Sequence, residues 1–334
     1  MSTMLGRGHC GAHLSLVFTI DDSDSNPIRQ GSRGAGICLK DGVEAIAKGE
    51  DGEGNLSVRF IESDQDETLY EEVLKTLKEE VVEIGGKDWE LIIKISLPPS
   101  QGFGMSASGA IAAAISFQRA IGVPHEECIR RSFKIAHIVE RKRSSGLGDT
   151  TALSSGGVER RLSPGSPYQG ELLDLGPGLS EGWSCGTPVL LCWRRKTGTA
   201  TSRYIDNSKW KKSITEAGES SMKSIGSGEW GVGRWKELLE SSELFAKRSG
   251  LENDASRSEL LSSVNESIFS LGLSGELFGL LCMLGESVVV VPNDPESDGG
   301  WIDSLAGELQ ESGLTVFSSR VGEAIRESQN FVFS

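Results

Sequence analysis

One stretch of the chain combines residue types that bind phosphate groups. Residues 98–117 read PPSQGFGMSASGAIAAAISF, a glycine-rich loop followed by an alanine-rich segment. Glycines allow close backbone approach, and a helix amino terminus offers free N–H groups and partial positive charge. Ser106 adds a hydroxyl group for a hard cation. The stretch predicts a site for the phosphates of ATP; a tight strand-to-helix turn with a serine cap is the alternative.

Other common phosphate-binding and catalytic motifs do not fit. The chain contains no Walker A pattern, GxxxxGK[ST], and no GxSxG or HExxH motif. Gly102, Gly104 and Ala107 formally satisfy the dinucleotide pattern. That pattern also needs an acidic residue at the end of the next strand, whereas Glu126 and Glu127 fall in an expected helix. A Rossmann site is therefore not predicted.

Two histidines near the amino terminus have the spacing of metal ligands on a helix. His9 and His13 are four residues apart, but Gly8 and Gly11 beside them argue against a helix. The spacing alone therefore does not predict a metal site.

Composition limits the possible partners. The 334 residues suggest two domains, and the formal charge of −14 would repel nucleic acid. An anionic substrate would need a local basic pocket. The strongly basic segment, 130–143, precedes the loop SSGLGD at 144–149. It is either a solvated helix face or a source of positive field at that loop.

The cysteines and the amino terminus indicate a reducing compartment. The six cysteines are widely spaced and form no CxxC pair, which predicts reduced, structural thiols. We find neither an apolar signal region nor a membrane-spanning stretch. We expect a cytoplasmic enzyme or binding protein without membrane or nucleic-acid partners.

Hydrophobic periodicity predicts the elements that hold these residues. In the first half we expect a helix over 67–84, further helices over about 105–121 and from 124, and strands over 13–20, 35–40, 43–48, 56–61 and 89–97. An irregular connecting segment leads to a domain boundary near 178–187. Beyond it we expect strands at 188–193, 288–292 and 314–319 and helices at 208–226, 234–248, 256–271 and 295–312.

The glycine-rich stretch resembles the second motif of the GHMP kinase superfamily, which includes galactokinase, homoserine kinase and mevalonate kinase. That motif, Pro-x-x-x-Gly-Leu-Gly-Ser-Ser-Ala, is matched in register by Pro98, Gly102, Phe103, Gly104, Met105, Ser106 and Ala107. Phe103 and Met105 are mild departures. Residues 26–39, 144–167 and 282–291 are similar to the archaeal pantoate kinase branch, whereas about 200–270 carries no such similarity.

The resemblance implies a fold and an activity. The fold is the two-domain α+β GHMP kinase fold, with a ribosomal S5 domain 2-like ATP-binding domain over 1–180 and a ferredoxin-like domain over 181–334. The implied reaction is ATP-dependent phosphorylation of (R)-pantoate to (R)-4-phosphopantoate, with Mg²⁺ and a homodimeric enzyme. A kinase of another small hydroxy acid or homoserine, or a non-catalytic ATP-binding relative, is the alternative.

The resemblance also implies site residues. Asp149 faces the acceptor hydroxyl, Ser106 and Glu140 bind magnesium, and the nucleotide contacts are Pro98, Gly102, Phe103, Gly104, Met105, Ser106, Ala107 and Ser108. By its residue type alone, Asp149 also suits a helix cap. The implied substrate carboxylate needs a cation, for which Arg33, Arg160 and Arg161 are candidates, with His9 as a further substrate contact. Most of the superfamily has Pro-Gly-Lys or Pro-Gly-Arg where this chain has Arg7, Gly8 and His9, so electrostatic support for Asp149 must come from elsewhere.

Overall fold

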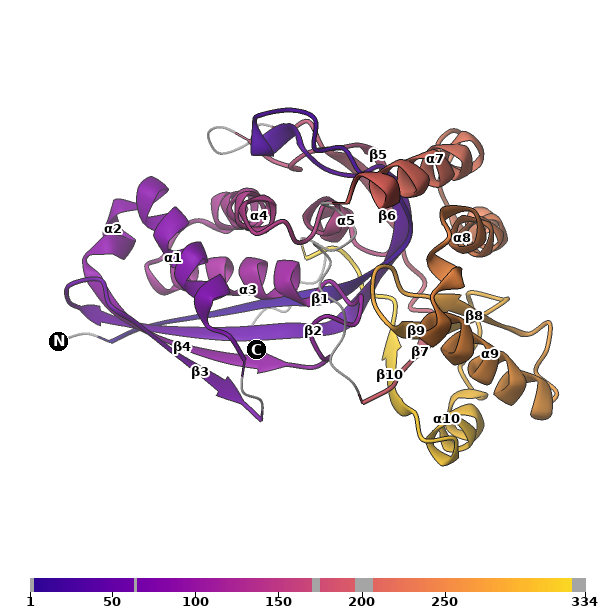
Figure 1. The fold of residues 1–334 in the computed structure, drawn as a ribbon. Helices are drawn as coiled ribbons and strands as arrows, with labels where there is room; N and C mark the ends of the chain where they lie inside the picture. The colour runs from indigo at the N-terminus through magenta and orange to yellow at the C-terminus, as the bar shows by residue number, and fades with distance from the viewer. Residues whose placement is uncertain (1–2, 63–64, 170–174, 196–206, 326–334) are drawn as a thin grey trace.

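Two β-sheets organise the chain (Figure 1). The structure is a computed structural model that describes residues 3–62, 65–169, 175–195 and 207–325. The first sheet has the order β3-β4-β2-β5-β6, with β1 paired to β2. Its strands are β1 (Met4–Phe18), β2 (Gly34–Asp51), β3 (Leu56–Ile61), β4 (Lys87–Ile95), β5 (Val158–Ser163) and β6 (Leu179–Trp183).

The long central strands differ from the sequence-based expectation. The separate strands predicted at 35–40 and 43–48 are wrong, because β2 runs without interruption from Gly34 to Asp51. It pairs with β1 along most of its length and also with β4 and β5, and these ladders override the turn tendency of Asp41 and Gly42. β1 starts at Met4, nine residues before the predicted start.

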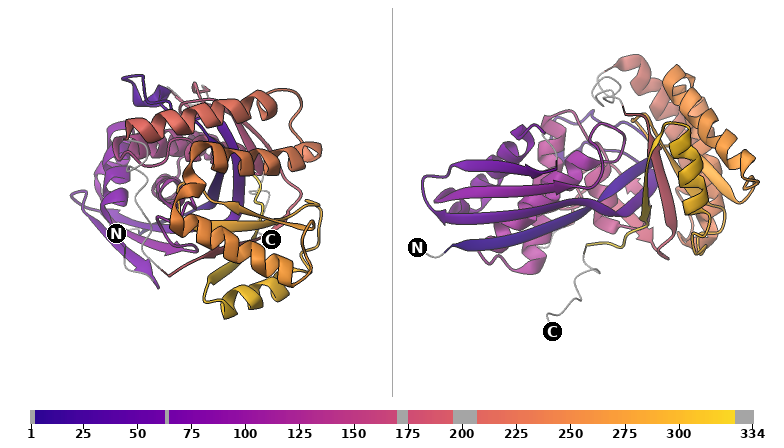
Figure 2. Two further views of the ribbon diagram at one scale, coloured as in Figure 1. Left: turned by 45° about the vertical axis from the view of Figure 1, so that its right-hand side comes forward. Right: turned by 90° about the horizontal axis from the view of Figure 1, so that it is seen from below.

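Helices cover one face of the first sheet, as the view from below in Figure 2 shows with the strands in front. They are α1 (Thr68–Glu80), α2 (Val82–Gly85), α3 (Met105–Ala120), α4 (His125–Lys142) and α5 (Asp149–Ser155). The predicted helix over 67–84 is divided at Val81, which has extended backbone angles. Small residues let α3 lie directly on β1 and β2, where nearly all of its side chains are buried.

The second sheet contains β7 (Pro188–Trp193), β8 (Leu277–Leu281), β9 (Ser287–Pro292) and β10 (Thr315–Arg320). Its order is β10-β7-β9-β8 with antiparallel neighbours, the ferredoxin-like arrangement. The associated helices are α7 (Ser208–Ile225), α8 (Trp235–Ser249), α9 (Ala255–Ser270) and α10 (Ile302–Glu311). The chain leaves the first sheet at Trp183 and enters the second at Pro188. The domain limits 1–180 and 181–334 stay a prediction.

Three elements of the second half differ from the expectation. The sequence analysis did not predict β6 and β8, which are only five residues long. The helix predicted from 295 begins at Ile302, because Gly299 has φ +89° and ends the preceding turn.

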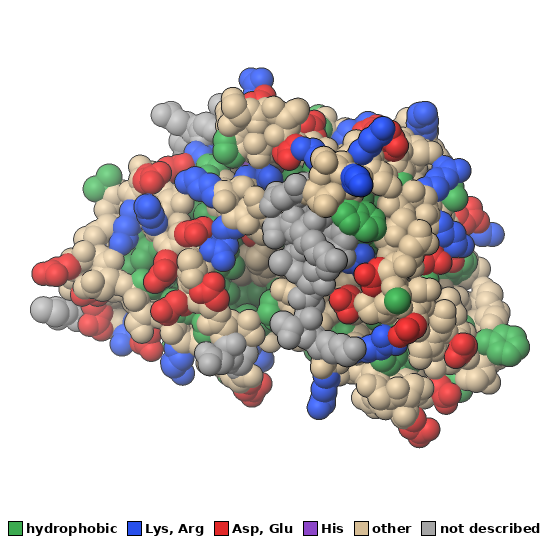
Figure 3. Space-filling view, viewed as in Figure 1, with side chains coloured by type: hydrophobic (Ala, Val, Ile, Leu, Met, Phe, Trp, Pro, Cys, Tyr) green, Lys and Arg blue, Asp and Glu red, His purple; other side chains and the backbone are tan. Residues whose placement is uncertain are grey.

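The basic residues of the segment 130–143 are largely paired with acidic side chains. Lys134 Nζ lies 2.6 Å from Glu80 Oε1, and Arg143 Nη1 lies 3.1 Å from Glu72 Oε1. Acidic and basic side chains alternate on the face shown in Figure 3. This arrangement favours the interpretation of 130–143 as an ion-paired surface over a concentrated positive field.

The cysteines are free thiols, as predicted, and five of the six are buried. No helix in the described part of the chain has both the length and the hydrophobicity needed to span a membrane.

The substitution Gly8→Ala tests the packing of β1 against α3. A Cβ at Gly8 would lie 1.9 Å from the carbonyl oxygen of Ala112. We expect Gly8→Ala to lower the free energy of unfolding by about 2 kcal/mol, measured by urea denaturation. Gly307→Ala is the control, because a Cβ there meets nothing within 4 Å and alanine favours α10 by about 1 kcal/mol. Equal stability of the two variants would contradict the packing.

Candidate active site

A cavity of about 350 Å³ lies where three segments meet. These are the glycine-rich loop before α3, the loop between α4 and α5, and the connection between β8 and β9. The lining residues are Ser15, Phe18, Ser32, Pro99, Ser100, Gly102, Phe103, Gly104, Met105, Ser106, Arg143, Ser144, Ser145, Gly146, Leu147, Gly148, Asp149, Arg161, Met283 and Leu284. The two sheets therefore contribute to one site.

The glycine-rich loop takes a backbone path that requires glycine. Gly102 has φ +82°, and Gly104, which precedes α3, has φ +63°. The second sheet holds the loop closely: a Cβ at Gly102 would lie 2.7 Å from the Cys282 carbonyl, and Ser287 Oγ donates to the Gln101 carbonyl at 2.5 Å. This path turns the first backbone groups of α3 toward the cavity.

Most of the predicted nucleotide contacts line this cavity. Gly102, Phe103, Gly104, Met105 and Ser106 do so.

Three do not. Pro98 lies beside the lining residues Pro99 and Ser100, and Ala107 is buried. Ser108 is fully buried and donates to the Gly11 carbonyl at 2.5 Å, so its hydroxyl is already engaged inside the fold.

Ser106 and Asp149 line the cavity, and the buried Glu140 lies next to them. Ser106 Oγ donates to Glu140 Oε1 at 2.6 Å, and the Gly146 N–H donates to Glu140 Oε2 at 2.7 Å. A Cβ at Gly146 would lie 2.4 Å from both Glu140 Oε2 and Asp149 Oδ2, so the two carboxylates face each other across this glycine.

These oxygen atoms fit the magnesium ion implied by the resemblance. Burial, together with the charge of Asp149, raises the pKa of Glu140. A divalent cation held by Ser106 and Glu140 would relieve this unfavourable electrostatic energy. Hydroxyl and carboxylate oxygens are the ligands that Mg²⁺ prefers.

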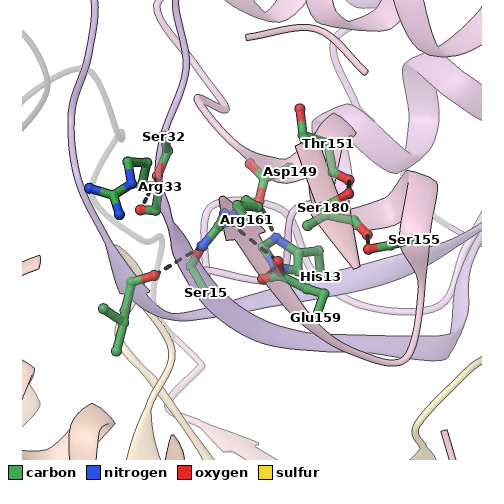
Figure 4. A network of polar contacts seen from close by, with 12 residues as sticks. His13, Ser15, Ser32, Arg33, Asp149, Thr151, Ser155, Glu159, Arg161 and Ser180 are labelled. Atoms are coloured by element: carbon green, nitrogen blue, oxygen red, sulfur yellow. Dashed lines mark hydrogen bonds and ion pairs between the residues drawn. The ribbon is translucent and has the colours of Figure 1, made fainter. Parts of the chain in front are cut away.

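His13 connects Asp149 to the interior (Figure 4). Its Nδ1 lies 2.5 Å from Asp149 Oδ1, and its Nε2 lies 3.0 Å from Glu159 Oε1. Arg161 Nε lies 3.5 Å from the second oxygen of Glu159. Burial alone would lower the pKa of His13, but hydrogen bonds and charges from the two carboxylates outweigh it and raise that pKa.

The contact with His13 has the opposite effect on the pKa of Asp149. Burial alone would raise the pKa of this carboxyl group, but the hydrogen bond and charge of His13 lower it overall. Asp149 therefore stays ionised near neutral pH. This role of His13 could not be predicted from the sequence, because its two carboxylate partners are 136 and 146 residues away along the chain.

His137 holds the residue that follows Asp149. Its Nδ1 lies 3.0 Å from Thr150 Oγ1 and its Nε2 lies 3.0 Å from the Pro27 carbonyl oxygen. A neutral ring satisfies both partners, since Nε2–H donates to the carbonyl and Nδ1 accepts from the hydroxyl. Burial lowers the pKa of His137 to about 4.

The candidate arginines lie in different places. Arg161 lines the cavity, and its guanidinium donates to Ser15 Oγ at 3.2 Å and to the Val17 carbonyl at 3.0 Å. Arg160, the next residue on β5, points to the opposite face and contacts Glu181.

The other two predicted substrate contacts lie outside the cavity lining. Arg33 Nη1 donates to Glu219 Oε2 at 2.7 Å, and its guanidinium points away from Asp149 in Figure 4. His9 is exposed on β1. The structure therefore brings Arg161 to the site but not Arg33, Arg160 or His9.

Comparisons with known proteins show which family the chain resembles. Residues 68–157 match the family model described as GHMP kinases N terminal domain. The chain is 31% identical over 170 residues to the pantoate kinase of Thermococcus kodakarensis and 26% identical over 283 residues to that of Methanocaldococcus jannaschii. These alignments cover 49% and 81% of this chain and 54% and 90% of the two relatives. The resemblance to the GHMP kinases is confirmed.

Solved structures show the same fold. A structure described as "Phosphotransferase related to CoA biosynthesis pathway" superposes with a TM-score of 0.75 at 22% identity, covering 96% of this chain and 97% of that one. A second, "MDDEF in complex with MVAPP, AMPPCP and Magnesium", has a TM-score of 0.61 at 12% identity, with 96% and 98% coverage. The chain has the GHMP kinase fold.

The low pKa of His137 predicts a loss of stability in acid. Between pH 6.5 and about 4 the unfolded chain binds a proton at this residue that the folded chain does not. We expect acidification over this range to cost the wild type up to about 3 kcal/mol relative to His137→Gln. Urea unfolding of both proteins between pH 4 and 7 measures this difference, and a pH-independent difference would contradict a neutral buried His137.

Proposed function

We propose that the protein catalyses ATP-dependent phosphorylation of (R)-pantoate to (R)-4-phosphopantoate, a step of archaeal coenzyme A synthesis. The observation that carries this proposal is one cavity lined by Ser106, the ionised Asp149 and Arg161, with the buried Glu140 hydrogen-bonded to Ser106. Two relatives that are named pantoate kinase support the choice of substrate.

The glycine-rich loop is the proposed site for the phosphates of ATP. Free backbone N–H groups at the start of α3 can donate to anionic oxygens, and no acidic side chain lies in the first turn of this helix. Ser106 and Glu140 would hold magnesium, which when bound neutralises charge on the phosphoryl oxygens. Glu140 is in turn fixed by the Gly146 N–H.

Asp149 is the proposed catalytic residue. Its Oδ1 is held by His13, which leaves Oδ2, on the Gly146 side, to accept a hydrogen bond from the acceptor hydroxyl. A carboxylate with a lowered pKa is a weak base. It therefore orients the hydroxyl and accepts its proton as the phosphoryl group transfers, which suits a loose transition state.

Arg161 is the proposed clamp for the carboxylate of pantoate. A guanidinium binds a carboxylate through two parallel hydrogen bonds. The hydroxyl groups of Ser15 and Ser32 line the same cavity, and Phe18 and Leu284 provide apolar surface for the methyl groups of pantoate. Both ends of the acceptor molecule would thus have complementary groups.

An assay of ADP release tests both the identity of the acceptor and the catalytic role of Asp149. The protein is given Mg-ATP together with pantoate, homoserine, mevalonate or shikimate. We expect turnover with pantoate, and a loss of at least about 100-fold in kcat in Asp149→Asn. Turnover with another acceptor only would establish a different small-molecule kinase. ATP binding without turnover on any acceptor would favour a non-catalytic relative.

The carboxylate clamp is tested by two matched arginine substitutions. Arg161→Lys keeps the charge but loses the bidentate geometry, so we expect the KM for pantoate to rise about 10-fold or more while the KM for ATP changes little. Arg33→Lys is the comparison, because Arg33 contacts Glu219 and does not line the cavity. A selective rise in Arg33→Lys instead would return the clamp to Arg33, and equal changes in both KM values would exclude the variant residue as a clamp.

A further inference from the structure

A buried histidine lies between two carboxylates beneath the cavity. His13 and Glu159 have fully buried side chains, whereas the side chain of Asp149 is 19% exposed. The two ring nitrogens of His13 face one carboxylate each, at 2.5 Å and 3.0 Å. In Figure 4 the imidazole occupies the space between Asp149 and Glu159, with Arg161 beside it.

This arrangement requires a charged ring. A neutral imidazole has one N–H donor and one lone pair, whereas an ionised carboxylate only accepts hydrogen bonds. With carboxylates on both sides, both ring nitrogens of His13 must carry hydrogen. His137, which faces a hydroxyl and a carbonyl, has no such requirement.

Charged side chains of both signs surround His13. The facing groups are Asp149 on α5 and Glu159 on β5; Arg161 pairs with Glu159, Glu140 on α4 lies across Gly146 from Asp149, and the buried thiol of Cys38 on β2 lies near Glu159. With His13 protonated, two positive side chains offset Asp149 and Glu159. Without that proton, the fully buried Glu159 and the ionised Asp149 would share only Arg161.

The surrounding backbone fixes the ring in place. A Cβ at Gly36 would lie 2.8 Å from His13 Nε2 and 2.9 Å from Glu159 Oε1, so the β2 backbone passes directly beneath this pair. Arg161 holds Glu159 from the other side. The imidazole therefore has little freedom to turn away from Asp149.

His13 also contacts the glycine-rich loop. The ladder between β1 and β2 shifts register between Gly11 and His13, and the His13 backbone N–H donates to the Phe103 carbonyl at 3.0 Å. One residue is thus bonded to the phosphate-binding loop through its backbone and to Asp149 through its side chain.

We propose that His13 is a positioning residue, whose imidazolium holds the Asp149 carboxylate at a fixed place relative to the phosphate-binding loop, with Oδ2 directed at the acceptor hydroxyl. This inference rests on the proposed function. His13 does not line the cavity and acts on the reaction through Asp149.

Two substitutions separate positioning from a purely structural role. The side-chain nitrogen of His13→Asn takes the place of Nδ1 and can still donate to Asp149, whereas that of His13→Gln reaches the place of Nε2 and donates to Glu159. We expect kcat to fall less than about 10-fold in the first variant and about 100-fold or more in the second, with the KM for ATP within about 3-fold of wild type in both.

If His13 had only a structural role, kcat would fall further in His13→Asn than in His13→Gln. His13→Asn removes the hydrogen bond from His13 to the fully buried Glu159, so it is expected to be the less stable variant in thermal unfolding. If kcat follows stability, or is equal in the two variants, the proposal is overturned. If His13→Asn does not fold, adding Glu159→Gln removes the buried carboxylate that has lost its hydrogen bond, and the double variant is compared with His13→Gln.

A measurement without turnover separates this proposal from the proposed function. The low-field NMR spectrum of the wild type should show two N–H protons of His13, both lost in His13→Gln and one shifted in Asp149→Asn. A single proton would overturn the charged bridge. His125→Asn is the matched control, since His125 is exposed at the start of α4, roughly 22 Å along the helix from Glu140. A wild type without pantoate turnover would overturn the proposed function, and the NMR result would still decide whether His13 holds Asp149.

Discussion

The site depends on one charged contact, the bridge that His13 forms between Asp149 and Glu159. Two carboxylates this close to each other in the interior repel unless a positive group lies between them. The imidazolium keeps Asp149 ionised and fixes its direction. The superfamily motif that supplies a lysine or arginine after Pro-Gly is absent here, and His13 provides the positive charge from four residues further along β1.

The glycine-rich loop depends on the second sheet as much as on its own glycines. The connection between β8 and β9 packs against Gly102, and Met283 N–H donates to the Ser15 carbonyl of β1 at 3.1 Å. Met283 and Leu284 then complete the cavity wall. Arg257 on α9 donates to the Leu284 and Gly285 carbonyls, which links the helices of the second sheet to this wall. Neither sheet alone would form the site.

Two buried histidines show how surroundings decide charge. His13 faces two carboxylates and is positive, whereas His137 faces a hydroxyl and a carbonyl and is neutral. Both hold the start of α5, one through Asp149 and the other through Thr150. The net charge of the chain is −14, but Arg161 and His13 place positive charge at and beneath the cavity.

Contiguous motifs with fixed spacing were enough to predict the glycine-rich loop and, through the family resemblance, the fold. The same resemblance singled out Glu140 and Asp149, which the structure places on either side of Gly146. Most helices and strands of the protein could also be predicted from the local hydrophobic periodicity of the sequence. The sequence did not show the continuity of β2, because ladder hydrogen bonds with distant strands outweigh a local turn tendency.

Which basic side chains lie at the cavity could be seen only in the tertiary structure. Alternation along β5 directs Arg161 to the cavity and Arg160 away from it, but only the packed sheet shows which face is which. His13 meets its carboxylate partners across separations of 136 and 146 residues. Charge, orientation and protonation at such a site arise from groups brought together by folding, so no local pattern in the sequence encodes them.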